Sequence, residues 1–185
     1  MRCKSTRLIS ERGFYMRIYI VGSIASGKTT LAKKISNKLR IKCKHLDGIV
    51  HIKDKTNKEW GNIRRTDEEI DPLFKSIITK PHWIIEDAGR KMFSEGMEVA
   101  DMIVHLKPSI FVRRMRVLTR FFKQKLGMEE CLYTPSLHML KFMFKALNNY
   151  ENGKDDLEAR LKQYTNKVVI LSSSKEIKRF MERII

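Results

Sequence analysis

Eight residues near the start of the chain carry the strongest chemical signal in this sequence. Residues 22–29 read Gly-Ser-Ile-Ala-Ser-Gly-Lys-Thr and match the pattern G-x-x-x-x-G-K-[ST] at every fixed position. The glycines allow the backbone to turn consecutive amide N–H groups inward, around a cluster of phosphate oxygens. These residue types at this spacing therefore predict a phosphate-binding loop, the P-loop, that holds a nucleoside triphosphate.

Individual residues of this loop have separate predicted roles. Lys28 can reach the β- and γ-phosphates as a point charge, and the Thr29 hydroxyl can ligate Mg²⁺. The residues expected to contact the nucleotide are Gly22, Ser23, Ile24, Ala25, Ser26, Gly27, Lys28, Thr29 and Thr30. No Asn-Lys-x-Asp sequence for reading guanine follows, so ATP with Mg²⁺ is the expected ligand. A chance glycine-rich turn is the alternative, and it does not account for the flanking strand and helix.

Three carboxylates are candidates for work beside the phosphates. Asp47 ends a predicted strand over residues 41–47, and Glu86 and Asp87 follow the apolar part of a predicted strand that begins at His82. Carboxylates at such strand ends can hold Mg²⁺ or orient an attacking hydroxyl. Plain turn carboxylates are the alternative, and the pattern leaves open which of Glu86 and Asp87 faces the metal.

A basic stretch follows the predicted fourth strand. From Met102 to Met128 the chain has no acidic residue. Its basic residues are Lys107, Arg113, Arg114, Arg116, Arg120, Lys123 and Lys125. Apolar spacing beyond Pro108 predicts a helix to about Lys125, within a lid at about residues 109–128. Cations on a lid can stabilise the charge of a transferred phosphoryl group.

This helix is expected to present two different faces. Its apolar stripe is formed by Phe111, Met115, Leu118 and Phe122. Arg113, Arg116 and Arg120 lie on another face. We therefore expect the apolar stripe to pack and the arginines to meet phosphate. A solvated basic surface and a contact with nucleic acid are the alternatives.

Short apolar strands alternate with helices along the chain. The predicted strands are 18–21, 41–47, 82–86, 102–106 and 168–171. Predicted helices cover 31–39, 66–79, a segment from Pro108 to about Lys125, two segments between 136 and 164, and a segment after Ser173. The polar stretch before Thr66 is expected to be a loop. This alternation predicts an α/β fold with a parallel sheet covered on both faces, and ligands at the carboxyl ends of its strands.

The length and the net charge of the chain limit its domain organisation and its partners. The 185 residues suit a single domain, expected over residues 16–185, with residues 1–15 as a flexible extension or an artefact of the start site. A formal charge of +17 points to anionic partners: nucleotides, and nucleic acid as a further option. Three widely spaced cysteines match neither a disulfide framework nor a zinc cluster, which suits a reducing cytoplasm. No apolar run is long enough to span a bilayer, so no membrane partner is expected.

Several short sequences together resemble one known family. They are the P-loop, His45-Leu46-Asp47, Trp83-Ile84-Ile85-Glu86, Gly89-Arg90, Ala100-Asp101 and Arg116-Val117-Leu118. In this order, from Met16 nearly to the end, the chain resembles the bacterial adenylate-kinase-like proteins called topology modulation proteins. That group is similar to nucleoside monophosphate kinases, which implies a three-layer α/β/α P-loop NTPase fold with five parallel strands.

The resemblance also implies roles for single residues. Lys28 would clamp phosphate, Arg90 would contact the acceptor, and Arg116 and Arg120 would be the catalytic arginines of the lid. Two departures bear on these roles. The chain has Glu86-Asp87-Ala88 where the family has Asp-Gly-Asn, and its short lid lacks the four-cysteine zinc site of some adenylate kinases.

Two functions fit these observations. The first is a kinase that transfers the γ-phosphate of Mg·ATP to a nucleotide or another small acceptor, bound near Asp47 and Arg90. The second is a nucleotide-dependent regulator that binds DNA or RNA through its basic surface. The acceptor cannot be named from the residues alone.

Overall fold

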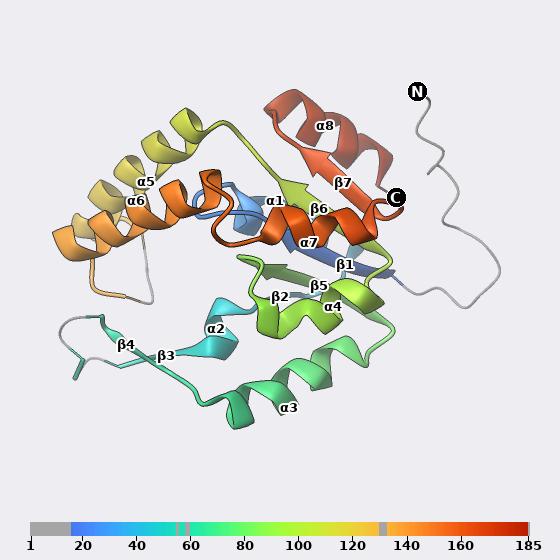
Figure 1. Cartoon of the computed structure of the whole chain (residues 1–185), viewed down its shortest axis with the longest axis horizontal. Helices are drawn as coiled ribbons and strands as arrows, with labels where there is room; N and C mark the ends of the chain where they lie inside the picture. Colours follow the sequence, from blue (N-terminus) through green and yellow to red (C-terminus); the bar gives the residue numbers. More distant parts are fainter. Residues whose placement is uncertain (1–15, 55, 58–59, 130–132, 185) are drawn as a thin grey trace.

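A five-stranded parallel sheet forms the centre of the protein (Figure 1). The computed structural model describes residues 16–54, 56–57, 60–129 and 133–184. The sheet contains β1 (Met16–Val21), β2 (Cys43–His45), β5 (His82–Asp87), β6 (Met102–Leu106) and β7 (Val168–Leu171), in the order β2-β5-β1-β6-β7. All neighbouring strands are parallel, which confirms the predicted fold class. The expected N-terminal extension, residues 1–15, lies outside the described residues.

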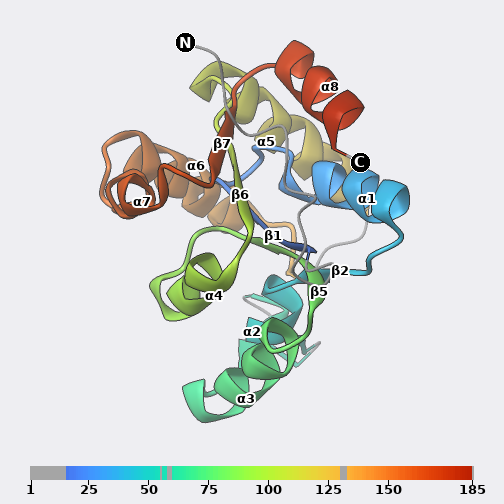
Figure 2. The same ribbon diagram turned by 90° about the vertical axis from the view of Figure 1, so that its right-hand side faces the viewer.

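Helices cover both faces of this sheet (Figures 1 and 2). One face carries α1 (Lys28–Leu39) and α8 (Ser174–Arg183). The other carries α3 (Asp67–Ile78), α4 (Ser94–Val99) and α7 (Leu157–Leu161), with short 3₁₀ turns at Lys91–Phe93 and Lys162–Tyr164. In the described part of the chain, no helix is both long enough and apolar enough to cross a membrane.

Successive side chains of the central strand, β1, contribute to two hydrophobic cores on opposite faces of the sheet. Ile18 and Ile20 of β1 point to the side of α1 and α8, and Tyr19 and Val21 point to the side of α3 and α4. All four side chains are buried, because successive residues of a strand face opposite sides of a sheet that is covered twice. This arrangement holds the carboxyl end of β1, where the P-loop begins, between two packed layers.

The structure corrects the prediction for the segment after the second strand. The strand itself is shorter than expected, and Asp47 opens a one-turn helix, α2 (Asp47–Val50). The stretch that was predicted to be loop contains an antiparallel pair, β3 (His51–Lys53) and β4 (Asn62–Arg64). Each strand of this hairpin has three residues and a single isoleucine, Ile52 or Ile63, which is too short a pattern to detect in the sequence.

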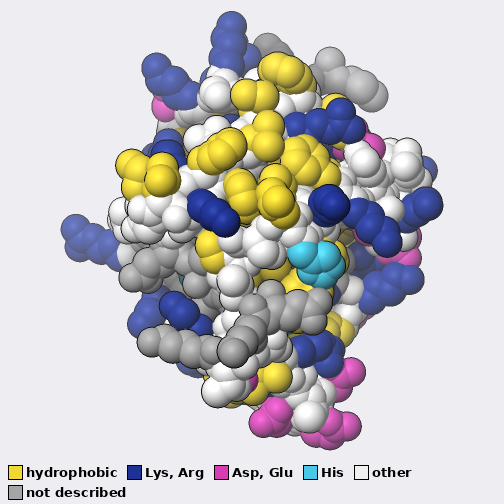
Figure 3. All heavy atoms as spheres, turned by 90° about the vertical axis from the view of Figure 1, so that its left-hand side faces the viewer, with side chains coloured by type: hydrophobic (Ala, Val, Ile, Leu, Met, Phe, Trp, Pro, Cys, Tyr) yellow, Lys and Arg dark blue, Asp and Glu magenta, His cyan; other side chains and the backbone are white. Residues whose placement is uncertain are grey.

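The prediction for the basic helix, α5 (Ile110–Lys125), was right in extent and wrong in orientation. Phe111 is 70% exposed and Phe122 is 60% exposed, so the apolar stripe faces outward (Figure 3). The residues that α5 buries are Arg113, Val117, Phe121 and Gln124. This face packs toward the P-loop and α6 (Leu137–Glu151), where Arg113 pairs with the buried Ser23 hydroxyl and with the partly exposed Glu151 carboxylate.

Candidate functional site

The P-loop connects β1 to α1 and has the backbone that its glycines predict. A Cβ at Gly22 would lie 2.4 Å from the carbonyl oxygen of Leu106, so only glycine fits at this crossing with β6. Gly27 has φ of 100°, in the left-handed region that glycine adopts without strain, and it directly precedes α1. The N-terminus of α1 therefore opens onto a large cavity, lined by residues 24–31 among others, where its free N–H groups favour anions.

Two polar groups of the loop fit a phosphate cluster. The Ser26 hydroxyl is buried and has no hydrogen-bond partner within the described residues. The Lys28 ammonium donates to the Ser23 carbonyl oxygen at 2.9 Å. Burial lowers the pKa of Lys28, and Glu86 and Asp47 only partly oppose this shift. A polyanion would supply the charge that this partly desolvated ammonium lacks.

Thr29 and Glu86 meet beside the loop. The Thr29 hydroxyl lies 3.1 Å from both carboxylate oxygens of Glu86, which also pairs with Nδ1 of His45 at 3.1 Å. Hydroxyl and carboxylate oxygens are ligands that Mg²⁺ prefers, so this pair fits a magnesium ion held beside the phosphates. Of the two neighbouring carboxylates at the end of β5, Glu86 is therefore the one that faces this position.

Asp87 interacts with a different set of groups. It accepts hydrogen bonds from the backbone N–H groups of Gly89, at 2.7 Å, and Arg90, at 2.6 Å. The Arg90 guanidinium pairs with Asp87 through one nitrogen and with Asp47 through another. Burial alone would raise the pKa of Asp47, but Arg90 and Lys28 outweigh it and lower that pKa. The structure thus brings Asp47 and Arg90 together across the end of the sheet.

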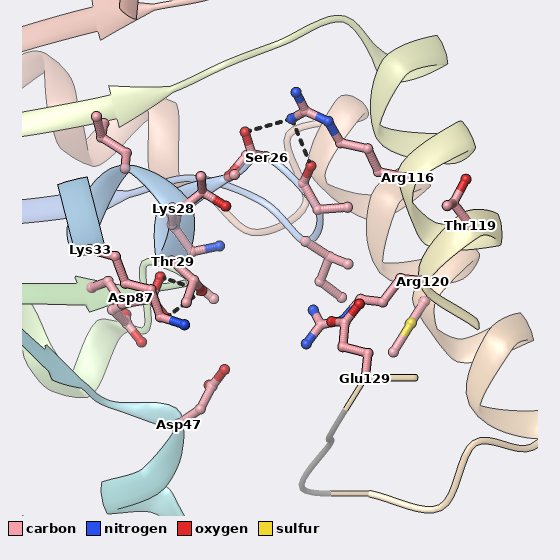
Figure 4. Close-up of a pocket in the computed structure, with 18 of the residues that line it drawn as sticks. Ser26, Lys28, Thr29, Lys33, Asp47, Asp87, Arg116, Thr119, Arg120 and Glu129 are labelled. Carbon is pink, nitrogen blue, oxygen red and sulfur yellow. Dashed lines mark hydrogen bonds and ion pairs between the residues drawn. The ribbon is translucent and has the colours of Figure 1, made fainter. Parts of the chain in front are cut away.

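The two arginines predicted to serve the lid lie on the cavity wall. Arg116 reaches from α5 to the P-loop, where Nη1 donates to the carbonyl oxygens of Ala25, at 3.2 Å, and Ser26, at 3.0 Å (Figure 4). Arg120 pairs with Glu129 at 3.0 Å. Both arginines line the same cavity as Lys28.

Arg113 was expected to meet phosphate, and it is instead buried behind the loop. Its guanidinium donates to the Ser23 hydroxyl at 2.6 Å, pairs with Glu151 of α6 and lies over the Tyr150 ring, 5.0 Å from its centre. The side chain is 2% exposed. Arg113 thus supports the P-loop from outside the cavity. Sequence spacing gave no signal for this role, because it depends on residues of a helix far along the chain.

Aromatic and apolar side chains close the cavity opposite the sheet. The cavity has a volume of about 1930 Å³ and extends from the P-loop to Asp47. Trp60 packs edge-on against His138 at 5.1 Å and against Phe142 at 5.6 Å. The backbone N–H of Thr134 donates to the Trp60 carbonyl oxygen at 2.9 Å, which ties the hairpin loop to the segment before α6.

The sequence did not predict that several of these residues line the cavity. The structure adds His51, Asn62, Tyr133, Met139 and Phe142 to the cavity. They come from the hairpin, from α6 and from the segment before it. Only Trp60 offered a signal, as an aromatic residue within a polar stretch.

Three solved structures place this geometry among known folds. A gluconokinase from Sinorhizobium meliloti 1021 has a TM-score of 0.53 at 15% identity, over 94% of this chain and 91% of that one. A sugar kinase from Janibacter sp. HTCC2649 has a TM-score of 0.52 at 16% identity, over 91% of each chain. A shikimate kinase from Bacteroides thetaiotaomicron has a TM-score of 0.50 at 18% identity, over 92% of this chain and 96% of that one.

No protein-family model and no curated protein matches the sequence. At identities below one fifth, the likeness to these structures shows the fold alone. The chain therefore shares the fold of these three structures, a five-stranded parallel sheet between helices.

Proposed function

We propose that this protein is a small-molecule kinase that transfers the γ-phosphate of ATP to a hydroxyl group. One observation carries the proposal: a single cavity joins the P-loop lysine, the Thr29–Glu86 pair and the Asp47–Arg90 pair. A donor site and an acceptor site that share one cavity allow direct transfer between two bound molecules. Phosphoryl transfer needs such alignment and charge neutralisation more than it needs covalent chemistry by the protein.

Each residue then has a defined task. The P-loop N–H groups and Lys28 bind the phosphates, and Arg116 holds the loop carbonyls while its charge lies near the transferred group. Thr29 and Glu86 would hold Mg²⁺, which neutralises phosphate charge when bound. Asp47 orients the attacking hydroxyl, and Arg90 fixes Asp47. Arg120, released from Glu129, would add a second positive charge from α5.

Finer assignments rest on the sequence. The resemblance to the topology modulation proteins stays a prediction, as do the preference for adenine and the cytoplasmic location. The kinases with similar folds favour phosphotransfer over the alternative of a nucleic-acid-binding regulator. The names gluconokinase, sugar kinase and shikimate kinase suggest hydroxylated metabolites as acceptors, which is consistent with an orienting carboxylate at Asp47.

A phosphotransfer screen tests the proposal. The full chain would be incubated with Mg·ATP and with nucleosides, nucleoside monophosphates, sugars and small hydroxylated acids, and both ADP and the phosphorylated product would be measured. We expect transfer to at least one class of hydroxylated acceptor. ATP binding without transfer to any of these classes would refute the assignment as a kinase.

A further inference from the structure

The acceptor end of the cavity points to one chemical class of substrate. Resting on the proposed kinase function, we infer that the acceptor is an uncharged hydroxylated molecule with a flat ring, such as a nucleoside, and is not a monophosphate. Three features of the cavity favour such an acceptor: the neutralised charge of Arg90, the positions of the other cations and the wall around Trp60.

The positive charge of Arg90 is already neutralised by two carboxylates, so this residue does not attract an anionic acceptor. Its guanidinium is shared between Asp47 and Asp87, and the Asp87 side chain is fully buried. Burial would lower the pKa of Arg90, but the two carboxylates raise it, so this group stays cationic and paired. Two carboxylates and one guanidinium give this cluster a net charge of about −1. A phosphate monoester, with nearly two negative charges, would be repelled here unless free cations faced it.

The other cations of the cavity belong to different walls. Apart from Arg90, the described lysines and arginines that line it lie on α1, α5 and α8. Two arginines close to Asp47 in the fold are engaged elsewhere: Arg64 pairs with Asp67, and Arg65 donates to the carbonyl oxygens of residues 48 and 49. Within the described residues, both guanidinium groups beside the hairpin and α2 are therefore held by other protein groups, Arg64 by a carboxylate and Arg65 by backbone carbonyl oxygens.

The wall facing Asp47 suits a flat ring. Trp60 and Phe142 both line the cavity and contact each other edge-on, and Met139 lies beside them. Two polar side chains lie at this end. The Asn62 amide donates to the Trp60 carbonyl oxygen at 3.3 Å, and the buried Nδ1 of His51 has no hydrogen-bond partner within the described residues. An aromatic surface with neutral hydrogen-bonding groups recognises a ring that carries polar edges, such as a nucleobase.

The reaction that this geometry supports is balanced without a further reactant. The acceptor hydroxyl oxygen forms a bond to the γ-phosphorus, and the bond from that phosphorus to the bridging oxygen of ATP breaks. The electron pair of the broken bond stays on ADP. The hydroxyl proton passes to the carboxylate of Asp47 and from there to water. The products are ADP and a phosphate monoester.

Matched pairs of acceptors test this inference. The rates of transfer from Mg·ATP to adenosine, uridine and guanosine would be compared with those to the corresponding monophosphates. We expect kcat/KM to favour the nucleosides by at least about tenfold. Equal or higher values for the monophosphates would overturn the inference while leaving the kinase function in place. Transfer only to acceptors without a ring would also overturn it, and transfer to no acceptor would overturn both proposals.

A charge variant sharpens the test. Asp47→Asn removes one of the two carboxylates that neutralise Arg90. We expect kcat/KM for nucleosides to fall, and the ratio of monophosphate to nucleoside activity to rise by about tenfold. An unchanged ratio would mean that the Asp47–Arg90 pair does not set the charge selectivity of this site, contrary to the inference.

A substitution of Trp60 tests the aromatic wall of the cavity independently of the charge at Arg90. Trp60→Leu should raise KM for the nucleoside by roughly tenfold and leave KM for ATP within about twofold of the wild-type value. Phe111→Ala is the matched control, because this aromatic side chain is exposed on α5 and does not line the cavity. Equal nucleoside KM values for both variants and the wild type would overturn the stacking role of Trp60.

Discussion

The proposed donor end and the proposed acceptor end of the cavity differ in their charge. The donor end uses backbone N–H groups, a helix N-terminus and Lys28, all from one short segment of chain. The acceptor end uses side chains from separate elements, and its one guanidinium is balanced by Asp47 and Asp87. A strongly positive site therefore adjoins one that is slightly negative. Under the proposed function, this difference in charge would separate the triphosphate from the molecule that receives the phosphate.

The largest expected effect concerns the donor end. Lys28→Ala should reduce kcat by at least about a hundredfold, because no other residue supplies a cation within the loop itself. Steady-state assays of ADP formation would measure the loss. Lys42→Ala is the matched control, since Lys42 is exposed between α1 and β2, and it should keep wild-type activity. Equal activities of the two variants would remove Lys28 from the reaction.

The same comparison explains what sequence alone could predict. The P-loop lies within eight consecutive residues, so its chemistry is visible in local spacing. Strands β1, β5, β6 and β7 were visible because strands that are covered on both faces contain continuous apolar runs. Asp47 was visible only as a carboxylate at the end of a predicted strand, and its pairing with Arg90 depends on the crossover that places β5 beside β2.

Tertiary contacts decided the features that sequence analysis missed. The outward stripe of α5 follows from the burial of Arg113, whose partner Glu151 is 38 residues away. Periodicity cannot distinguish an apolar face that packs from one that faces outward because an arginine on the other face is buried. The wall around Trp60 depends likewise on contacts with α6 and with the segment before it.

Replacing Arg113, which supports the P-loop, should have a smaller effect. Arg113→Met breaks the pair with Glu151 and leaves the Ser23 hydroxyl without its donor. We expect the free energy of unfolding to fall by roughly 2 kcal/mol, less than for a fully buried pair, because Glu151 is 33% exposed. Urea denaturation would measure it. Arg114→Met, on the exposed side of α5, should change stability by less than about 0.5 kcal/mol, and an equal loss in both variants would contradict this role.

A change in the Thr29–Glu86 pair should have an effect similar to, or smaller than, that of replacing Arg113. Thr29→Val keeps the shape of the side chain and removes the hydroxyl that contacts Glu86. We expect the Mg²⁺ concentration for half-maximal activity to rise by about tenfold, while activity at saturating Mg²⁺ partly recovers. A magnesium titration of initial rates would show this. An unchanged titration curve would mean that the metal lies elsewhere.

The smallest expected effect is a flat pH dependence at the acceptor end. Since the pKa of Asp47 is lowered from its ordinary value of 3.8, the carboxylate stays ionised down to more acidic pH. Its stabilising pair with Arg90 is therefore complete above pH 3.8 and is lost only as the pH falls through the lowered pKa. The ratio of wild-type to Asp47→Asn kcat/KM should stay constant from about pH 5.5 to about pH 8. A ratio that falls toward acid within this range would show that Asp47 titrates near neutral pH.

Calorimetric titration tests the central claim most directly. Purified full-length chain would be titrated with ATP in the presence of Mg²⁺, alongside the Lys28→Ala and Lys42→Ala variants. We expect saturable heat of binding for the wild type and for Lys42→Ala, and none for Lys28→Ala. Absence of binding heat in the wild type with ATP and with GTP would contradict a triphosphate site in the P-loop.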